Sequence, residues 1–335
     1  MPPAASQPPT RSRTILLIAL APVYITLLLY FVHPNASDLK LSALSYLKQL
    51  SKVTAPIVST FIKPISTSST TPTMSPVQII PRRSEARGHA DHGWLKTFHT
   101  FSFAMYHEGD HDSYGCLRVI NEDRVAAKNG FGTHSHREFE IFSYVVDGEL
   151  EHKDSMGNTE ILKRGDLQLT SAGTGISHSE KTPQNATKPV HFLQIWSVPS
   201  IPRLQPKYFT RHFSDAEKKD KFVRIVAPID AEGVHKDQRE GEGPAPVQSP
   251  LTLYATLLSP GKKLSIQMEG KKGYAHVVMT SGYNEGKGSG ASVKVADKEV
   301  LREGDGAYLA QETGTEVVVE NTGDRVAEVL LFDLA

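Results

Sequence analysis

From residue 77 onward, short apolar runs alternate with turn residues along the chain. Residues 139–146 read FEIFSYVV, Asp147-Gly148 follows, and the alternation of apolar and polar positions resumes at Leu150. Runs of this length, rich in β-branched and aromatic residues and separated by Gly, Asp or Asn, are typical of a β-meander. The helical period nearly disappears over this part of the chain. The pattern predicts an all-β protein built as a sandwich or barrel.

A second set of apolar runs follows the proline-spaced segment 198–206 and has the same character. The predicted strands of this set cover residues 222–226, 251–258, 263–268, 275–280, 292–295, 306–309, 316–320 and 329–332. Two β-units of similar size in one chain fit the usual size of protein domains. We therefore expect a first unit over residues 77–197 and a second over residues 205–335.

The first 76 residues have a different pattern. Residues 14–32 read TILLIALAPVYITLLLYFV, a run of about 19 residues without a charge that is long enough to cross a bilayer as a helix. We predict a short tail over residues 1–13, a membrane-spanning helix over 14–32, and a linker with a short amphipathic helix over 33–76. A cleaved signal or an organelle presequence are the alternatives to a permanent anchor. Basic residues on both sides leave the orientation open.

Met74 lies directly before the β-rich region. Translation from Met1 predicts a single-pass membrane-anchored protein, whereas translation from Met74 predicts a protein of the cytoplasm or nucleus.

The overall charge and the cysteine count narrow the expected partners. Lysine plus arginine and aspartate plus glutamate number 37 each, so no global field attracts nucleic acid, and we expect no direct nucleic-acid binding. Cys116 is the only cysteine, which excludes an intrachain disulfide. No activating pair surrounds Cys116, and a catalytic thiol is disfavoured.

Two histidine-containing segments carry the candidate chemistry. The first reads GTHSHREFE and contains His134 and His136, and the second reads AGTGISHSE and contains His178 and Glu180. On an extended strand, residues i and i+2 point to the same face, so each pair can reach one ion inside a barrel. Two such strands side by side would supply three imidazole nitrogens and one carboxylate. Glu138 and Glu140 compete with Glu180 for the carboxylate role or lie behind the ligands.

The predicted donor set limits the choice of metal. Imidazole with one carboxylate suits one divalent ion, and we expect Fe²⁺, with Ni²⁺, Cu²⁺, Mn²⁺ and Zn²⁺ as alternatives. The absence of thiolate argues against a structural zinc site. Four protein ligands leave about two positions of an octahedron open for substrate and dioxygen.

Other candidate residues have a simpler interpretation. His99, in the run TFHTF, is expected to be a hydrogen-bonded core histidine rather than a ligand. Trp196, Phe101 and Phe103 are expected to be core residues rather than walls of a substrate site.

The same segments resemble the pirin family of double-barrelled cupins. The resemblance rests on DHGWLKTFHTFSF at 91–103, LRVINED at 117–123, EHKDSMGN at 151–158 and the two histidine segments, and it covers about 260 residues from Val77 to the end. It implies two tandem cupin jelly-roll barrels with a metal in the N-terminal one only. The ligands it implies are His134, His136, His178 and Glu180. Ser171 stands where the general cupin pattern has proline, as in pirins.

The resemblance implies two classes of function. Quercetinase-like members open a flavonol ring with dioxygen, which predicts a quercetin 2,3-dioxygenase-like enzyme acting on a small aromatic substrate and O₂. In that reaction Glu180 is the expected general base. Other members are iron-dependent coregulators, which predicts a transcription-factor partner and no turnover. A metal-binding protein without either activity is the third interpretation.

Overall fold

The computed structural model describes residues 77–335. The predicted tail 1–13, membrane helix 14–32 and linker 33–76 lie outside the described residues. Within residues 77–335, no helix is long and apolar enough to cross a membrane.

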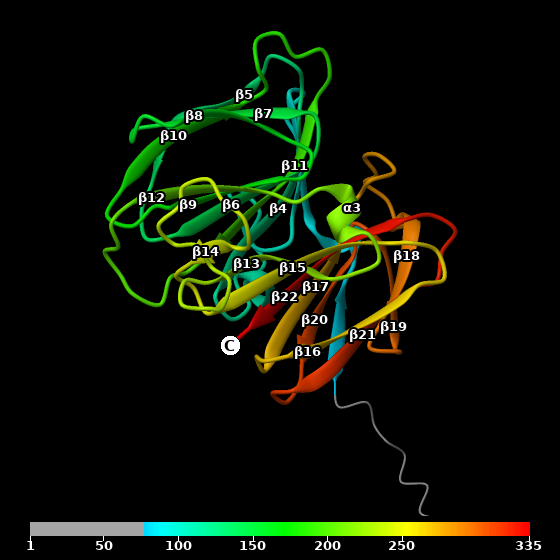
Figure 1. Ribbon diagram of the computed structural model, residues 1–335. Coiled ribbons are helices and arrows are strands. Elements are labelled where there is room, and N and C mark those ends of the chain that lie inside the picture. Colours follow the sequence, from blue (N-terminus) through cyan, green and yellow to red (C-terminus); the bar gives the residue numbers. More distant parts are fainter. Residues whose placement is uncertain (1–76) are drawn as a thin grey trace, which may run out of the picture. The chain divides into compact units, whose positions relative to one another are not determined.

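The first half of the described chain folds into two facing antiparallel sheets (Figure 1). The larger has the order β12-β9-β6-β11-β4-β3-β2 and the smaller has the order β5-β10-β7-β8. The strands of the larger sheet are β2 (Gly88–Asp91), β3 (Leu95–His99), β4 (Leu117–Val125), β6 (Glu140–Asp147), β9 (Asp166–Ser171), β11 (Val190–Ser197) and β12 (Lys207–His212). Those of the smaller sheet are β5 (Gly130–His136), β7 (Glu149–Asp154), β8 (Thr159–Lys163) and β10 (Ile176–Lys181).

The second half repeats this arrangement of one seven-stranded and one four-stranded sheet. The larger sheet, β1-β20-β17-β22-β15-β13-β14, contains β1 (Gln78–Arg82), β13 (Val223–Pro228), β14 (Ala245–Val247), β15 (Leu251–Leu258), β17 (Lys272–Val277), β20 (Gly306–Ala310) and β22 (Ala327–Leu334). The smaller sheet, β16-β21-β18-β19, contains β16 (Lys263–Met268), β18 (Ser289–Val295), β19 (Glu299–Glu303) and β21 (Thr315–Asn321). The helical turns are η1 (Ser84–Ala86), η2 (Gly109–His111) and α3 (Asp215–Lys218).

These elements confirm the predicted all-β class. The predicted strands 251–258 and 263–268 coincide with β15 and β16, whereas the strand predicted at 275–280 is β17, which begins three residues earlier. The predicted division into two units did not include an exchange of strands between the two halves. β1, first in the described sequence, pairs with β20 of the second half, and β12 pairs with β9 of the first half. The unit boundaries at 197 and 205 stay a prediction.

Apolar side chains form a core between the two seven-stranded sheets. Phe142, Tyr144 and Leu193 of the first half share this cluster with Leu253 and Phe332 of the second. The interior of the second half is filled by aliphatic side chains that include those of Val293 and Leu331. The interior of the first half has only two small apolar clusters. The first half therefore keeps space for polar groups and a cavity.

One buried carboxylate, Glu122 of β4, joins the two halves. It is fully buried, and its oxygens lie 3.0 Å from His191 Nε2, 3.1 Å from His276 Nε2 and 3.4 Å from Arg87 Nη2. The backbone N–H of Met279 also donates to it, at 2.7 Å. Burial alone would raise the pKa of Glu122, but the two imidazole donors outweigh it and hold the pKa well below its usual range. Glu122 is therefore ionised and paired across the junction.

We expect Glu122→Gln to lower the free energy of unfolding by about 3–5 kcal/mol, because it leaves the buried Arg87 guanidinium without its anion. Chemical denaturation of the two proteins side by side measures this. The exposed Glu316→Gln of β21 is the matched control and should change stability by less than about 0.5 kcal/mol. Equal losses in the two variants would contradict the assignment.

Candidate metal centre

The position of β10 between β5 and β7 assembles the site. In the antiparallel register, His178 of β10 lies opposite His134 of β5, and Ile176 lies opposite His136. On the other side of β10, Glu180 lies opposite His152 of β7. A bulge between His178 and Glu180 shifts the pairing with β5. The two histidine segments thus lie on neighbouring strands, as the sequence predicted.

Three imidazoles converge on one point. One ring nitrogen of each of His134, His136 and His178 lies within 4.8 Å of the others. His134 Nε2 and His178 Nε2 are 3.2 Å apart. Two nitrogens that each lie about 2.1 Å from one ion are roughly 3.0–3.4 Å apart in octahedral or tetrahedral sites. The spacing therefore fits a shared ion, and the role of these residues as ligands stays a prediction.

His152 is a member of the site that the sequence analysis missed. His152, His178 and Glu180 form a second group with ligand atoms within 4.8 Å of one another, and all three residues are buried. His152 Nε2 lies 3.3 Å from Asp154 Oδ2, and its Nδ1 has no hydrogen-bond partner among the described residues. The signal was in the sequence, because His152 and Asp154 repeat the i, i+2 pattern of the other two segments.

A polar row across the larger sheet holds Glu180. Ser143 Oγ donates to Glu180 Oε1 at 2.8 Å, and Gln194 Nε2 donates to Oε2 at 2.6 Å. Ser143, Gln194, Asn121 and His99 are cross-strand neighbours on β6, β11, β4 and β3. At the far end of the row, His99 Nδ1 donates to Asn121 Oδ1 at 2.9 Å. His99 is thus hydrogen-bonded and belongs to neither ligand group, as expected.

The charge states of the side chains suit metal binding. Burial would raise the pKa of Glu180, but the nearby His178 and His152 rings and the Ser143 hydroxyl outweigh it, and the pKa lies below its usual range. Burial and the neighbouring His178 and His134 lower the pKa of His136 to about 4. Burial also lowers the pKa of His178. Neutral imidazoles and an ionised carboxylate are the forms that bind a metal.

Glu138 and Glu140 do not join the site. Glu138 has a φ of 59°, so the chain turns there and the period-two pattern of β5 does not continue into β6. Glu138 Oε2 accepts a hydrogen bond from the Arg203 N–H. Glu140 Oε1 accepts from Ser171 Oγ at 2.6 Å, and burial raises its pKa to about 7. The prediction that either residue could supply the carboxylate is wrong, because the turn at Glu138 ends the alternation of side chains that begins at His134 and His136.

A cavity of about 660 Å³ opens onto the cluster. His134, His136 and Glu180 are among the residues that line it. Its aromatic lining consists of Trp94, Phe103, Phe131 and Trp196. The His136 and Trp196 rings meet edge to face with their centroids 4.8 Å apart. The expectation that Phe103 is a core residue is therefore wrong. Trp196 lines the cavity and also packs against a buried apolar cluster, and Phe101 is a core residue as expected.

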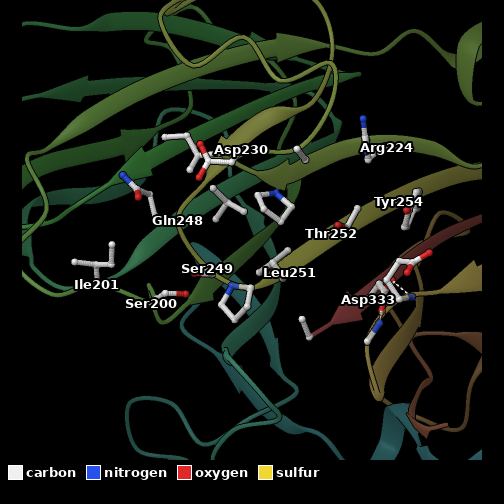
Figure 2. Close-up of a pocket in the computed structure, with 18 residues that line it drawn as sticks. Ser200, Ile201, Arg224, Asp230, Gln248, Ser249, Leu251, Thr252, Tyr254 and Asp333 are labelled. Atoms are coloured by element: carbon white, nitrogen blue, oxygen red, sulfur yellow. Dashed lines mark hydrogen bonds between the residues drawn. The ribbon is translucent and has the colours of Figure 1, made fainter. Parts of the chain in front are cut away.

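The second half shows no comparable cluster among the described residues. His276 is buried against Glu122, and His212 Nδ1 is 2.6 Å from Asp166 Oδ1. A hollow of about 560 Å³ lies beside β15, lined by Ser200, Arg224, Tyr254 and Asp333 among others (Figure 2). None of the residues that line it belongs to a ligand group.

Burial raises the pKa of the Cys116 thiol to about 11, which disfavours a reactive thiolate.

Comparison with known proteins shows which family this sequence resembles. The sequence model of the pirin family matches residues 81–197. The chain is 44% identical over 156 residues to quercetin 2,3-dioxygenase of Escherichia coli K12, which covers 47% of this chain and 67% of that protein. It is 31% identical over 258 residues to a provisionally named quercetin 2,3-dioxygenase of Zymomonas mobilis, covering 74% of this chain and 100% of that one.

A solved structure shows the same architecture. The bacterial pirin YhhW from Escherichia coli in complex with nickel(II) superposes with a TM-score of 0.64 at 33% identity, covering 77% of this chain and 99% of that one. Fold and site together define an all-β, cupin-like protein with a histidine and carboxylate cluster in one barrel. The chain belongs to the pirin family.

The lowered pKa of His136 predicts a pH effect on the metal-free protein. The unfolded chain binds a proton at this ring below about pH 6.5, whereas the folded chain does so only near pH 4. The stability contributed by the neutral ring is therefore present above pH 6.5 and is lost as the pH falls through about 4. Denaturation at several pH values should show a shallower loss in His136→Gln than in the unchanged protein. Parallel curves would contradict this.

Gln194 is not a candidate ligand, but its hydrogen bond to Glu180 predicts that it affects metal affinity. We expect Gln194→Leu to weaken metal binding about 10–100-fold, because Glu180 loses a donor that orients it. Competition with a coloured chelator measures the affinity. Gln267→Leu, on the exposed face of β16, is the control and should bind metal unchanged. A Gln194 variant with full affinity would show that Glu180 needs no such support.

Proposed function

We propose that this protein is a metal-dependent dioxygenase of the quercetin 2,3-dioxygenase type that acts on flavonol-like aromatic molecules with O₂. The observation that carries the proposal is the cavity with aromatic walls that opens onto the imidazole and carboxylate cluster. A volume of about 660 Å³ lies in the range of small-molecule sites. The names of the relatives from Escherichia coli and Zymomonas mobilis support the same reaction class.

We propose that His134, His136, His178 and Glu180 hold one divalent metal ion, with Fe²⁺ as the ion used. The donor set suits Fe²⁺ and also Ni²⁺, the ion present in the YhhW complex. When bound, the metal supplies Lewis-acid chemistry toward a substrate hydroxyl and toward dioxygen. The His152 ring lies in one group with His178 and Glu180, and it is proposed to orient these two side chains.

Each side chain around the cluster has a proposed role in the reaction. Glu180 is ionised, and it is proposed to accept the proton of the flavonol hydroxyl as general base. Ser143 and Gln194 keep its carboxylate fixed during this transfer. The flat faces of Phe103, Phe131 and Trp196 are proposed to orient the planar substrate and exclude water.

The test combines metal content with oxygen consumption. The anaerobically purified full chain, loaded with Fe²⁺, should hold about one ion per chain and consume O₂ when quercetin is added. His134→Ala and Glu180→Gln should each lose bound metal or more than about 100-fold of the rate, because each removes a ligand or the base. His107→Ala, a change of the same kind at an exposed loop position, is the control.

The outcomes separate the parts of the proposal. Bound metal without oxygen consumption for any flavonol would leave the metal centre and remove the dioxygenase function. Unchanged metal content in both variants would contradict the ligand assignment.

A further inference from the structure

The His152 imidazole has few polar contacts for a buried ring. It is fully buried, and its Nε2 lies 3.3 Å from Asp154 Oδ2, slightly longer than a normal hydrogen bond. Its Nδ1 has no hydrogen-bond partner among the described residues. The ring meets the His178 ring edge to face, with the centroids 5.3 Å apart. The orientation of the His152 ring therefore depends mainly on the groups that pack against it.

Tyr208 of β12 supplies a flat surface for this imidazole. The centroids of the Tyr208 and His152 rings are 4.8 Å apart, and the ring planes differ by 31°. The Tyr208 hydroxyl donates to Glu160 Oε2 at 2.9 Å. Burial and the Glu160 carboxylate raise the pKa of Tyr208, so the hydroxyl keeps its proton and this hydrogen bond. Tyr208 is thus anchored at its hydroxyl end while its ring packs against His152.

Arg239 completes the network from the second half of the chain, in the segment between β13 and β14. Its guanidinium lies over the Tyr208 ring, 5.2 Å from the centroid, and forms an ion pair with Glu160. Its Nε also donates to Asn158 Oδ1 at 3.0 Å, and Asn158 Nδ2 donates to Asp154 Oδ2 at 2.7 Å. Arg239 therefore joins two routes to the same buried imidazole, one through a packed ring and one through a hydrogen-bonded carboxylate.

The backbone around Arg239 is fixed to β12. The Thr210 N–H donates to the Arg239 carbonyl at 2.9 Å. The buried Arg211 guanidinium donates to the carbonyls of Arg239 and His235, at 3.1 and 2.9 Å. The Arg239 side chain itself is 39% exposed. Because exposed ion pairs contribute little to stability, folding alone does not account for this arrangement.

We propose that Arg239 is a positioning residue for the candidate metal centre. It holds Tyr208 flat against His152, and this contact fixes the imidazole. The fixed imidazole in turn restrains His178 and Glu180, the two candidate ligands in its group. The inference rests on the proposed metal centre and extends it to a residue of the second half. Groups behind metal ligands act in this way, and losing one weakens metal binding about 10–100-fold.

The first test measures the affinity of the full chain for Ni²⁺ by competition with a coloured chelator. Arg239→Gln and Tyr208→Leu should each weaken binding about tenfold. The double variant should lose about 20-fold rather than 100-fold, because both changes release the same imidazole. Lys236→Gln is the matched control, since this lysine lies in the same segment and pairs only with the exposed Asp230. The control should bind Ni²⁺ within twofold of the unchanged protein.

The second test separates positioning from a structural role. With Co²⁺ bound, Arg239→Gln and Tyr208→Leu should shift the visible absorption bands, which report ligand geometry. Tyr208→Phe keeps the flat ring and should restore the bands of the unchanged protein. The melting temperature of metal-free Arg239→Gln should equal that of Lys236→Gln, because both changes are made at partly exposed side chains.

The outcomes are distinct. Unchanged Ni²⁺ affinity in Arg239→Gln, or losses that multiply in the double variant, would overturn the inference while the metal centre stands. A melting temperature that falls in step with the affinity would assign Arg239 a purely structural role and also overturn it. If the unchanged protein binds neither Ni²⁺ nor Co²⁺, the metal centre and the inference fall together. Both tests measure metal binding, so they hold whether or not quercetin is oxidised.

Discussion

The pairing of β10 with β5 on one side and β7 on the other is the constraint on which the site depends. It sets His178 against His134 and Glu180 against His152, so all the candidate donors meet on one sheet. Side chains alternate between the two faces of a strand, and a slip of one residue would turn His178 and Glu180 out of the barrel. The bulge between these two residues adjusts the register to β5 without moving either residue to the other face. A backbone feature, rather than the histidines alone, therefore determines the candidate metal centre.

The two halves share one architecture but differ in the side chains that fill the space between their sheets. Both combine a seven-stranded with a four-stranded sheet. In the second half aliphatic side chains fill the space between the sheets, which stabilises the fold and leaves no ligand group there among residues 77–335. In the first half the corresponding space contains a polar row and aromatic walls. Exchange of β1 and β12 and the buried Glu122 tie the halves together, so the filled half can support the hollow one.

Much of the fold was readable in the sequence because the strands are short, alternating and bounded by turn residues. Strands β15 and β16 were predicted to the residue. The exchange of β1 and β12 was not predictable, because pairing between distant strands depends on which sheet edge is open rather than on any local pattern. The competing carboxylates were misjudged for a related reason. Counting positions from His136 to Glu140 assumes an extended chain, and the positive φ of Glu138 breaks that assumption.

The sequence by itself determined the all-β class, the pirin resemblance and the four candidate ligands, since i, i+2 spacing and strand content are local properties. Only the tertiary structure showed that His152 joins the cluster and that Phe103 and Trp196 line a cavity. Each of these depends on which strands lie side by side and which face is turned inward. The physical reason is that burial and hydrogen-bond partners arise between strands distant in the chain, where local pattern carries no information.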